Sequence, residues 1–114
     1  MAEINTESES KIELKRVMDK TKALLAALRS EGIRIASAYL YGSYASGAAH
    51  ADSDIDVAIV SPDLTGDRLQ DWMRLTLTAI QLDARFEVIG FRPEQFRDEH
   101  PLVWEIKQTG IRMD

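Results

Sequence analysis

Two short patterns in the middle of the chain have residue types and spacing suited to phosphate chemistry. Gly42-Ser43 is followed, after ten residues, by Asp54-Ile55-Asp56. A glycine lets the backbone approach a phosphate closely, and a serine at the start of a helix adds a hydroxyl and N–H groups. Side chains alternate along a strand, so the two aspartates share one face. Adjacent carboxylates repel unless a cation bridges them, and Mg²⁺ prefers oxygen ligands. The spacing therefore predicts chemistry on a nucleoside triphosphate.

Such a platform suits two divalent cations. One would lower the pKa of an attacking hydroxyl, and the other would bind the triphosphate and stabilise the leaving pyrophosphate. A third carboxylate must then come from another strand. Glu87 is the best candidate, because Phe86 and Val88 on either side would face the opposite way. Asp83 is the alternative, at the entrance of the same predicted strand.

The rest of the chain supplies the elements that would position these residues. Periodicity and turn signals predict a helix over residues 8–31, a strand over 33–41, a loop with a short helix over 42–53, a strand over 54–60, a helix over 65–82, a strand over 85–91 and a last helix over 101–109. This order predicts a small α/β (α+β) domain, a mixed sheet with helices packed on it. Leu69, Trp72, Met73 and Ile80 are the predicted core positions of the helix over 65–82. Residues 1–8 are expected to fray.

Length, net charge and the distribution of apolar residues limit the classes of protein to which the chain can belong. The 114 residues predict a single domain, residues 1–114, whose active site is shallow, so we expect a partner: another copy or a different chain. The net charge of −5 and the lack of a basic patch argue against nucleic-acid binding. No apolar run approaches a membrane span, and the acidic N-terminal stretch is unlike a signal peptide. The expected compartment is the cytoplasm.

With its flanks, the motif resembles a known family. The string Leu40-Tyr41-Gly42-Ser43-x-Ala45-x-Gly47, followed by Asp52-Ser53-Asp54-Ile55-Asp56-Val57, is similar to the signature of the DNA polymerase β-like nucleotidyltransferases, and in particular of the minimal nucleotidyltransferase branch. The resemblance covers roughly residues 33–110. It implies the nucleotidyltransferase fold, with a mixed sheet and helices packed on it.

The resemblance also implies roles for residues. Asp54 and Asp56 match metal ligands for two Mg²⁺ ions, and Glu87 matches the third carboxylate. Gly42 and Ser43 match the residues that hold the triphosphate, and Ser53 lies within the same nucleotide-binding motif. Many minimal members pair with a small helical HEPN protein. Some act as antitoxins of a toxin–antitoxin system and transfer AMP from ATP to a tyrosine of that HEPN partner.

Two positions depart from the family pattern, and they leave alternatives open. Many minimal members carry arginine where this chain has Tyr44 and Ser46, and loss of these cations would weaken triphosphate binding. The first interpretation is still a nucleotidyltransferase that transfers AMP to a tyrosine hydroxyl of a HEPN-type partner. The second reading is a weak or inactive module that inhibits its partner by contact. The third is transfer to a small molecule such as an antibiotic, with a partner subunit supplying the pocket.

Overall fold

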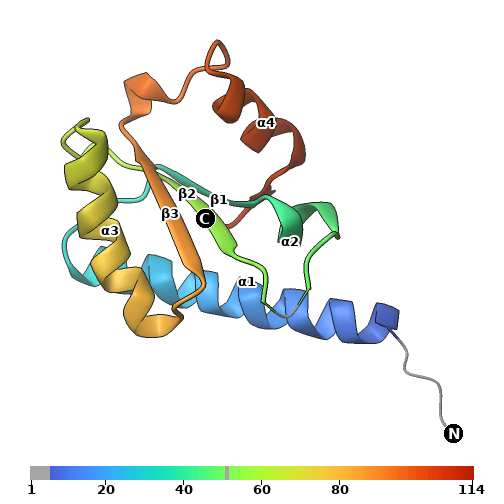
Figure 1. The fold of residues 1–114 in the computed structure, drawn as a ribbon. Coiled ribbons are helices and arrows are strands. Elements are labelled where there is room, and N and C mark those ends of the chain that lie inside the picture. The colour runs from blue at the N-terminus through green and yellow to red at the C-terminus, as the bar shows by residue number, and fades with distance from the viewer. Residues whose placement is uncertain (1–5, 51) are drawn as a thin grey trace, which may run out of the picture.

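The computed structural model describes residues 6–50 and 52–114 (Figure 1). Its elements are α1 (Thr6–Ser30), β1 (Ser37–Tyr41), α2 (Ser43–Ser46), β2 (Ile55–Val60), α3 (Arg68–Leu82), β3 (Phe86–Phe91), a 3₁₀ turn (Pro93–Gln95), α4 (Pro101–Thr109) and β4 (Ile111–Arg112). The predicted order of helices and strands is confirmed, with β4 as an addition. Helix α1 includes residues 6–8, which we expected to fray; residues 1–5 lie outside the described part.

The sheet has the order β3-β2-β1-β4. β1 pairs antiparallel with β2 and with β4, whereas β2 and β3 run parallel. The predicted mixed sheet is therefore confirmed. Parallel strands need a crossover connection, and α3 provides it between β2 and β3. Figure 1 shows α3 and β3 together at one margin of the molecule.

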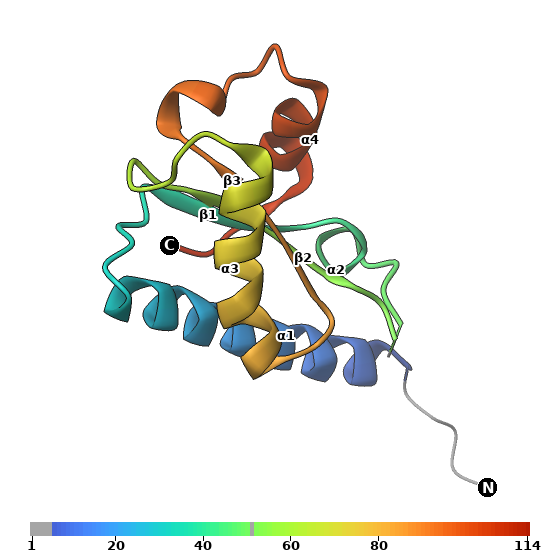
Figure 2. The same cartoon turned by 60° about the vertical axis from the view of Figure 1, so that its left-hand side comes forward.

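The two faces of the sheet differ in what they bury. Ile55, Val57 and Ile59 of β2 point into the main core, which α1 and α3 cover with Leu24, Leu25, Leu28, Leu75 and Ala79. The other face carries a smaller cluster in which Ala58 and Val60 pack against Val103 and Ile106 of α4. Figure 2 shows α1 and α4 on opposite sides of the sheet. On that second face, α4 covers the later part of β2, whereas Asp56, at its beginning, is partly exposed.

The first strand is shorter than predicted because the chain first closes helix α1. Gly32 adopts a left-handed φ of 87°, which a glycine takes without steric cost. The N–H of Ile33 then donates to the carbonyl of Leu28 at 3.1 Å. Ile33 is fully buried beneath the helix end, so it belongs to the cap, and β1 begins four residues later at Ser37.

Our prediction for the core face of α3 is wrong. Leu69, Trp72, Met73 and Ile80 are between 47% and 63% exposed, and the buried side chains are Asp71, Leu75 and Ala79. The cause lies at the start of the helix. The Asp71 carboxylate accepts hydrogen bonds from the N–H and hydroxyl of Thr65 and from the N–H of Gly66, and it is turned inward to reach them. The helix therefore carries a second apolar stripe that faces outward.

None of the helices described over residues 6–50 and 52–114 combines the length and apolar character that a bilayer crossing requires.

The buried Asp71 carboxylate gives a stability prediction. Asp71→Ala should lower the free energy of unfolding by about 1–3 kcal/mol, because it removes a buried carboxylate and leaves the partly buried donors of Thr65 and Gly66 without their acceptor. Arg74→Ala on the exposed side of the same helix is the control and should change it by no more than about 0.5 kcal/mol. Urea unfolding followed by circular dichroism measures both, and equal losses would contradict this role of Asp71.

Candidate active site

Strand register brings the predicted acidic residues onto one row of the sheet. Asp56 of β2 is paired with Tyr41 of β1 on one side and with Glu87 of β3 on the other. Directly paired residues of neighbouring strands point to the same face, so all three side chains stand on the face that α4 only partly covers. Asp54 lies two residues before Asp56, immediately before β2 begins, and is exposed. The structure thus places Asp54, Asp56 and Glu87 on a common surface.

The Gly-Ser turn lies directly against this row. Gly42 has φ 73° and ψ −147°, and it is the residue between β1 and the four-residue helix α2. A Cβ atom built on Gly42 would lie 2.3 Å from Oδ2 of Asp56. A Cβ would force the Asp56 carboxylate to move, and the positive φ with ψ −147° is a backbone conformation that essentially only glycine adopts. The backbone of the turn therefore touches the central carboxylate of the row, and Ser43 follows as the first residue of α2.

Burial and neighbouring carboxylates raise the pKa values of two side chains in the row. Burial, followed by the charges of Glu87 and Asp54, raises the pKa of Asp56 to about 6. Burial, followed by the charges of Asp56, Glu87 and Glu105, raises the pKa of Tyr41 to about 12. Among the described residues, no ion pair involves Asp54, Asp56 or Glu87. Their mutual repulsion is therefore not neutralised by protein groups.

A divalent cation fits this donor set. Carboxylate oxygens without a protein cation are what Mg²⁺ takes as ligands, and the acidic row faces outward, where substrate phosphates can complete the shell. In residues 6–50 and 52–114, no three His, Cys, Asp or Glu side chains are gathered closely enough to hold a metal as they stand. Like charges keep such side chains apart, so a cation would have to draw them together.

Asp83, the alternative third carboxylate, is engaged elsewhere. Its oxygens accept from Arg85 at 2.9 Å and from Lys20 at 2.6 Å. These partners, Arg85 first, hold the pKa of Asp83 well below its usual range. Arg85 also binds Glu13 of α1 at 3.1 Å. The Asp83 carboxylate therefore ties α1 to the entrance of β3, and it is not in the row with Asp56.

The two positions where the family often has arginine serve the fold in this chain. Tyr44 is buried, and its hydroxyl accepts from Arg85 at 3.0 Å and donates to the carbonyl of His50 at 3.3 Å. Ser46 donates to the carbonyl of Ser43. Ser53 accepts from the N–H of His50 at 2.9 Å and so closes the loop before Asp54. The loop is fixed from within, and positions 44 and 46 offer no cation to a phosphate.

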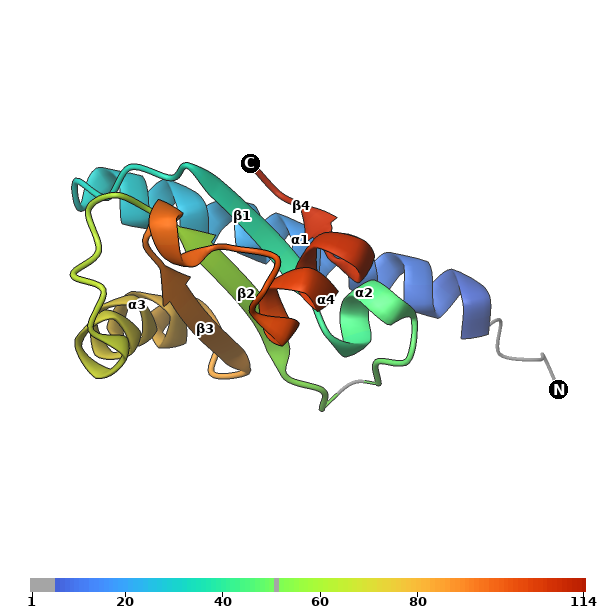
Figure 3. The same ribbon diagram turned by 90° about the horizontal axis from the view of Figure 1, so that it is seen from above.

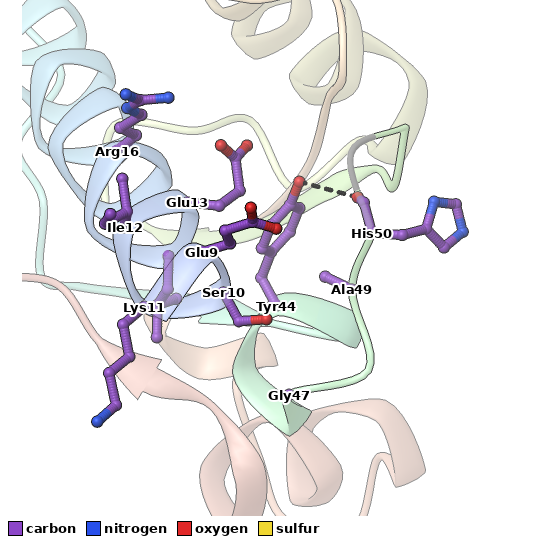
Figure 4. Close-up of a pocket in the computed structure, with 11 residues that line it drawn as sticks. Glu9, Ser10, Lys11, Ile12, Glu13, Arg16, Tyr44, Gly47, Ala49 and His50 are labelled. Carbon is purple, nitrogen blue, oxygen red and sulfur yellow. Dashed lines mark hydrogen bonds between the residues drawn. The ribbon is translucent and has the colours of Figure 1, made fainter. Parts of the chain in front are cut away.

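Two cavities border these residues. A cleft of about 460 Å³ is lined by Tyr41 and Glu87 together with Arg68, Leu69 and Trp72 of α3. We did not predict a role for Tyr41; its position directly before Gly42 was the available signal. A second cavity, of about 620 Å³, lies between the first half of α1 and the α2 loop, and Figure 4 shows the Tyr44–His50 hydrogen bond on its wall. No carboxylate of the row lines the second cavity, so only the cleft adjoins the candidate site.

The close approach at Gly42 gives a prediction with an internal control. Gly42→Ala should destabilise the protein more than Gly47→Ala, by at least about 1 kcal/mol. Both positions have a positive φ, with Gly42 at ψ −147° in the more restricted region, but a Cβ at Gly47 meets nothing within 4 Å. Alanine at position 47 therefore introduces backbone strain alone, whereas alanine at position 42 also displaces the Asp56 carboxylate. Chemical denaturation compares the two, and equal effects would show that the contact with Asp56 is unimportant.

The raised pKa of Asp56 predicts how stability depends on pH. Its folded value of about 6 lies above its ordinary 3.8, so the folded state binds more protons between those values. This group's contribution is therefore fully present below about pH 4 and is lost as the pH rises through 6. Without divalent cations, Asp56→Asn should gain on the order of 1 kcal/mol over wild type between about pH 4 and 7, a value reduced for solvent screening. Parallel stability curves would contradict this assignment.

Sequence comparisons find a matching family model and a curated relative of this chain. The sequence model of the nucleotidyltransferase domain matches residues 21–112. A curated relative, protein adenylyltransferase MntA of Shewanella oneidensis, is 32% identical over 69 residues, which are 60% of this chain. The chain spans about half the length of that relative, 49%.

Solved structures share the fold. A toxin–antitoxin solved with AMP-PNP has a TM-score of 0.61 at 23% identity, over 83% of this chain and 72% of that chain. A candidate nucleotidyltransferase of Sulfolobus solfataricus has a TM-score of 0.63 at 18% identity, over 98% and 89%. A mutant of the toxin–antitoxin MntA-HpeT has a TM-score of 0.58 at 18% identity, over 81% and 70%. At these identities the likeness shows the fold, while the sequence match over residues 21–112 shows that the chain belongs to the nucleotidyltransferase domain family.

Proposed function

We propose that the protein is a Mg²⁺-dependent nucleotidyltransferase that moves AMP from ATP to an acceptor hydroxyl. The observation that carries this proposal is the contact between the Gly42 turn and Asp56, which stands in register with Glu87. A phosphate-binding turn and a set of carboxylates without a protein cation are thereby joined on one surface. We also propose that the chain acts as one domain.

In this proposal each residue has a defined part. Asp54, Asp56 and Glu87 hold two Mg²⁺ ions, which when bound supply positive charge to the triphosphate and acidify the attacking hydroxyl. Gly42 and Ser43 hold the phosphates through backbone N–H groups and the Ser43 hydroxyl, and Ser53 adds its hydroxyl, because its own N–H donates to the carbonyl of His50. Glu87 lines the open cleft and helps to take the proton of the acceptor hydroxyl.

The bonds made and broken balance as in any nucleotidyl transfer. The acceptor oxygen forms a new bond to the α-phosphorus of ATP, and the bond from that phosphorus to the oxygen bridging to the β-phosphate breaks. Pyrophosphate leaves, and the proton of the acceptor hydroxyl passes to a carboxylate or to solvent. AMP remains attached to the acceptor.

A protein tyrosine is the acceptor we favour. The relative in Shewanella is named a protein adenylyltransferase, and two structures with the same fold come from toxin–antitoxins, one of them solved with AMP-PNP. By analogy we propose a HEPN-type partner that carries the tyrosine, in an antitoxin-like role. An alternative is favoured by Tyr44 and Ser46, which replace arginines expected for phosphate: inhibition of a partner by contact, without transfer.

Labelling tests the reaction. α-³²P-ATP and Mg²⁺ are added to a lysate of the source organism with wild type, Asp56→Asn or Glu87→Gln. We expect a labelled protein band with wild type and a loss on the order of 100-fold or more with Asp56→Asn, because the central metal ligand contributes several kcal/mol in the transition state. Glu87→Gln should also reduce labelling strongly.

Asp19→Asn is the control, since Asp19 is an exposed carboxylate on α1 and lies outside both the row and the signature. It should label as well as wild type. Label on a small molecule instead of a protein would support antibiotic-type transfer. Partner inhibition that survives Asp54→Asn/Asp56→Asn, with no label anywhere, would support the contact mechanism and reject the enzyme.

A further inference from the structure

Helix α3 exposes a continuous apolar stripe. Its members recur at spacings of three and four residues and lie on one side of the helix: Leu69 (63% exposed), Trp72 (50%), Met73 (50%), Leu77 (61%) and Ile80 (47%). We call these five residues the α3 face. Single exposed apolar residues are ordinary on protein surfaces, but a contiguous set of this kind marks an interaction site.

The α3 face adjoins the candidate active site. Figures 1 and 3 show α3 beside β3, the strand at the end of the sheet order. Leu69 and Trp72 belong to the face and also line the cleft of about 460 Å³ whose other wall includes Glu87 and Tyr41. One end of the apolar stripe therefore opens directly onto a carboxylate of the row. A macromolecule seated on the face would lie within reach of that carboxylate.

The charged side chains of α3 indicate the chemistry of a surface that would bind it. The chain carries a net charge of −5, yet the exposed charged side chains of α3 are both basic, Arg68 and Arg74. The acidic residue of this helix, Asp71, is buried and bound to the loop before it. The complementary surface is therefore apolar at its centre and acidic at its rim.

We propose that the α3 face docks the protein that carries the acceptor hydroxyl, and that the cleft at Trp72 admits the acceptor side chain to Glu87. This inference rests on the proposed function and adds the surface that selects the acceptor. The half-exposed Trp72 stands where the docking surface meets the cleft, which is the kind of central aromatic anchor that dominates binding energy at interfaces.

Other occupants fit less well. A nucleobase in the cleft would contact Trp72 but would leave Met73, Leu77 and Ile80 unused. A second copy of the chain, paired symmetrically through this helix, would bring Arg74 at its middle close to the Arg74 of the other copy, and it would close the cleft beside Glu87. A protein with an acidic rim uses both the stripe and its basic flank.

The test separates docking from chemistry. The labelling reaction is run with wild type, Trp72→Ser at the cleft, Ile80→Glu at the far end of the face and Trp104→Ser as control. Trp104 on α4 is 55% exposed and lies outside the face. ATP binding by equilibrium dialysis, sedimentation velocity and thermal unfolding are measured on the same proteins. All four proteins should unfold at the wild-type temperature, because the altered side chains are exposed.

We expect Trp72→Ser and Ile80→Glu each to reduce protein labelling at least tenfold, with Trp104→Ser unchanged and ATP binding equal in all four. Full labelling with Ile80→Glu would overturn the proposal, as would loss of ATP binding in Trp72→Ser, which would assign the cleft to the nucleobase. A wild-type dimer that Ile80→Glu dissociates would assign the face to a second copy. Absence of label with wild type would reject the proposed function itself, and the docking role with it.

Discussion

The contact between Gly42 and Asp56 is the constraint on which the site depends. The missing Cβ at Gly42 lets the turn after β1 press against a carboxylate of β2, because a Cβ there would lie 2.3 Å from Oδ2 of Asp56 and would force the carboxylate to move. The antiparallel pairing of Tyr41 with Asp56 brings the two chain segments to that place. The turn that we propose to bind phosphate and the acidic side chains are therefore positioned by sheet pairing, which is stiffer than a flexible loop would be.

The rest of the fold supports this arrangement by placing the main core and the acidic row on opposite faces of the sheet. α1 and α3 bury the main core on one face of the sheet, so the other face is free to carry charges at the beginning of β2 and β3. Among the described ion pairs, Arg85, which directly precedes β3, binds Asp83 and Glu13 and no carboxylate of the row. The repulsion left among Asp56, Asp54 and Glu87 is what a divalent cation would relieve.

Much of this arrangement follows from the sequence, because local patterns determine it. Alternation along β2 separates Ile55, Val57 and Ile59 from the aspartates, and Phe86 and Val88 do the same for Glu87. The face of α3 could not be predicted, because two stripes compete on that helix and the apolar one looks like a core. The choice is made by Asp71, whose partners are backbone groups of Thr65 and Gly66, and such a contact leaves no periodic signal. β4 has two residues and is defined only by its pairing with β1.

The row of Tyr41, Asp56 and Glu87 crosses three strands, so each strand contributes one member. A shift of pairing by one residue would turn that strand's contribution toward the core and bring an apolar side chain to the surface. A register shift in any one strand would therefore remove that strand's member from the row. β3 is the strand at the sheet's end, so fraying there would withdraw Glu87 while Gly42 and Asp56 stay together. In the proposed mechanism, local opening of β3 would remove Glu87 from the metal site and from the acceptor cleft, so the pairing of β3 would set the fraction of molecules competent to react.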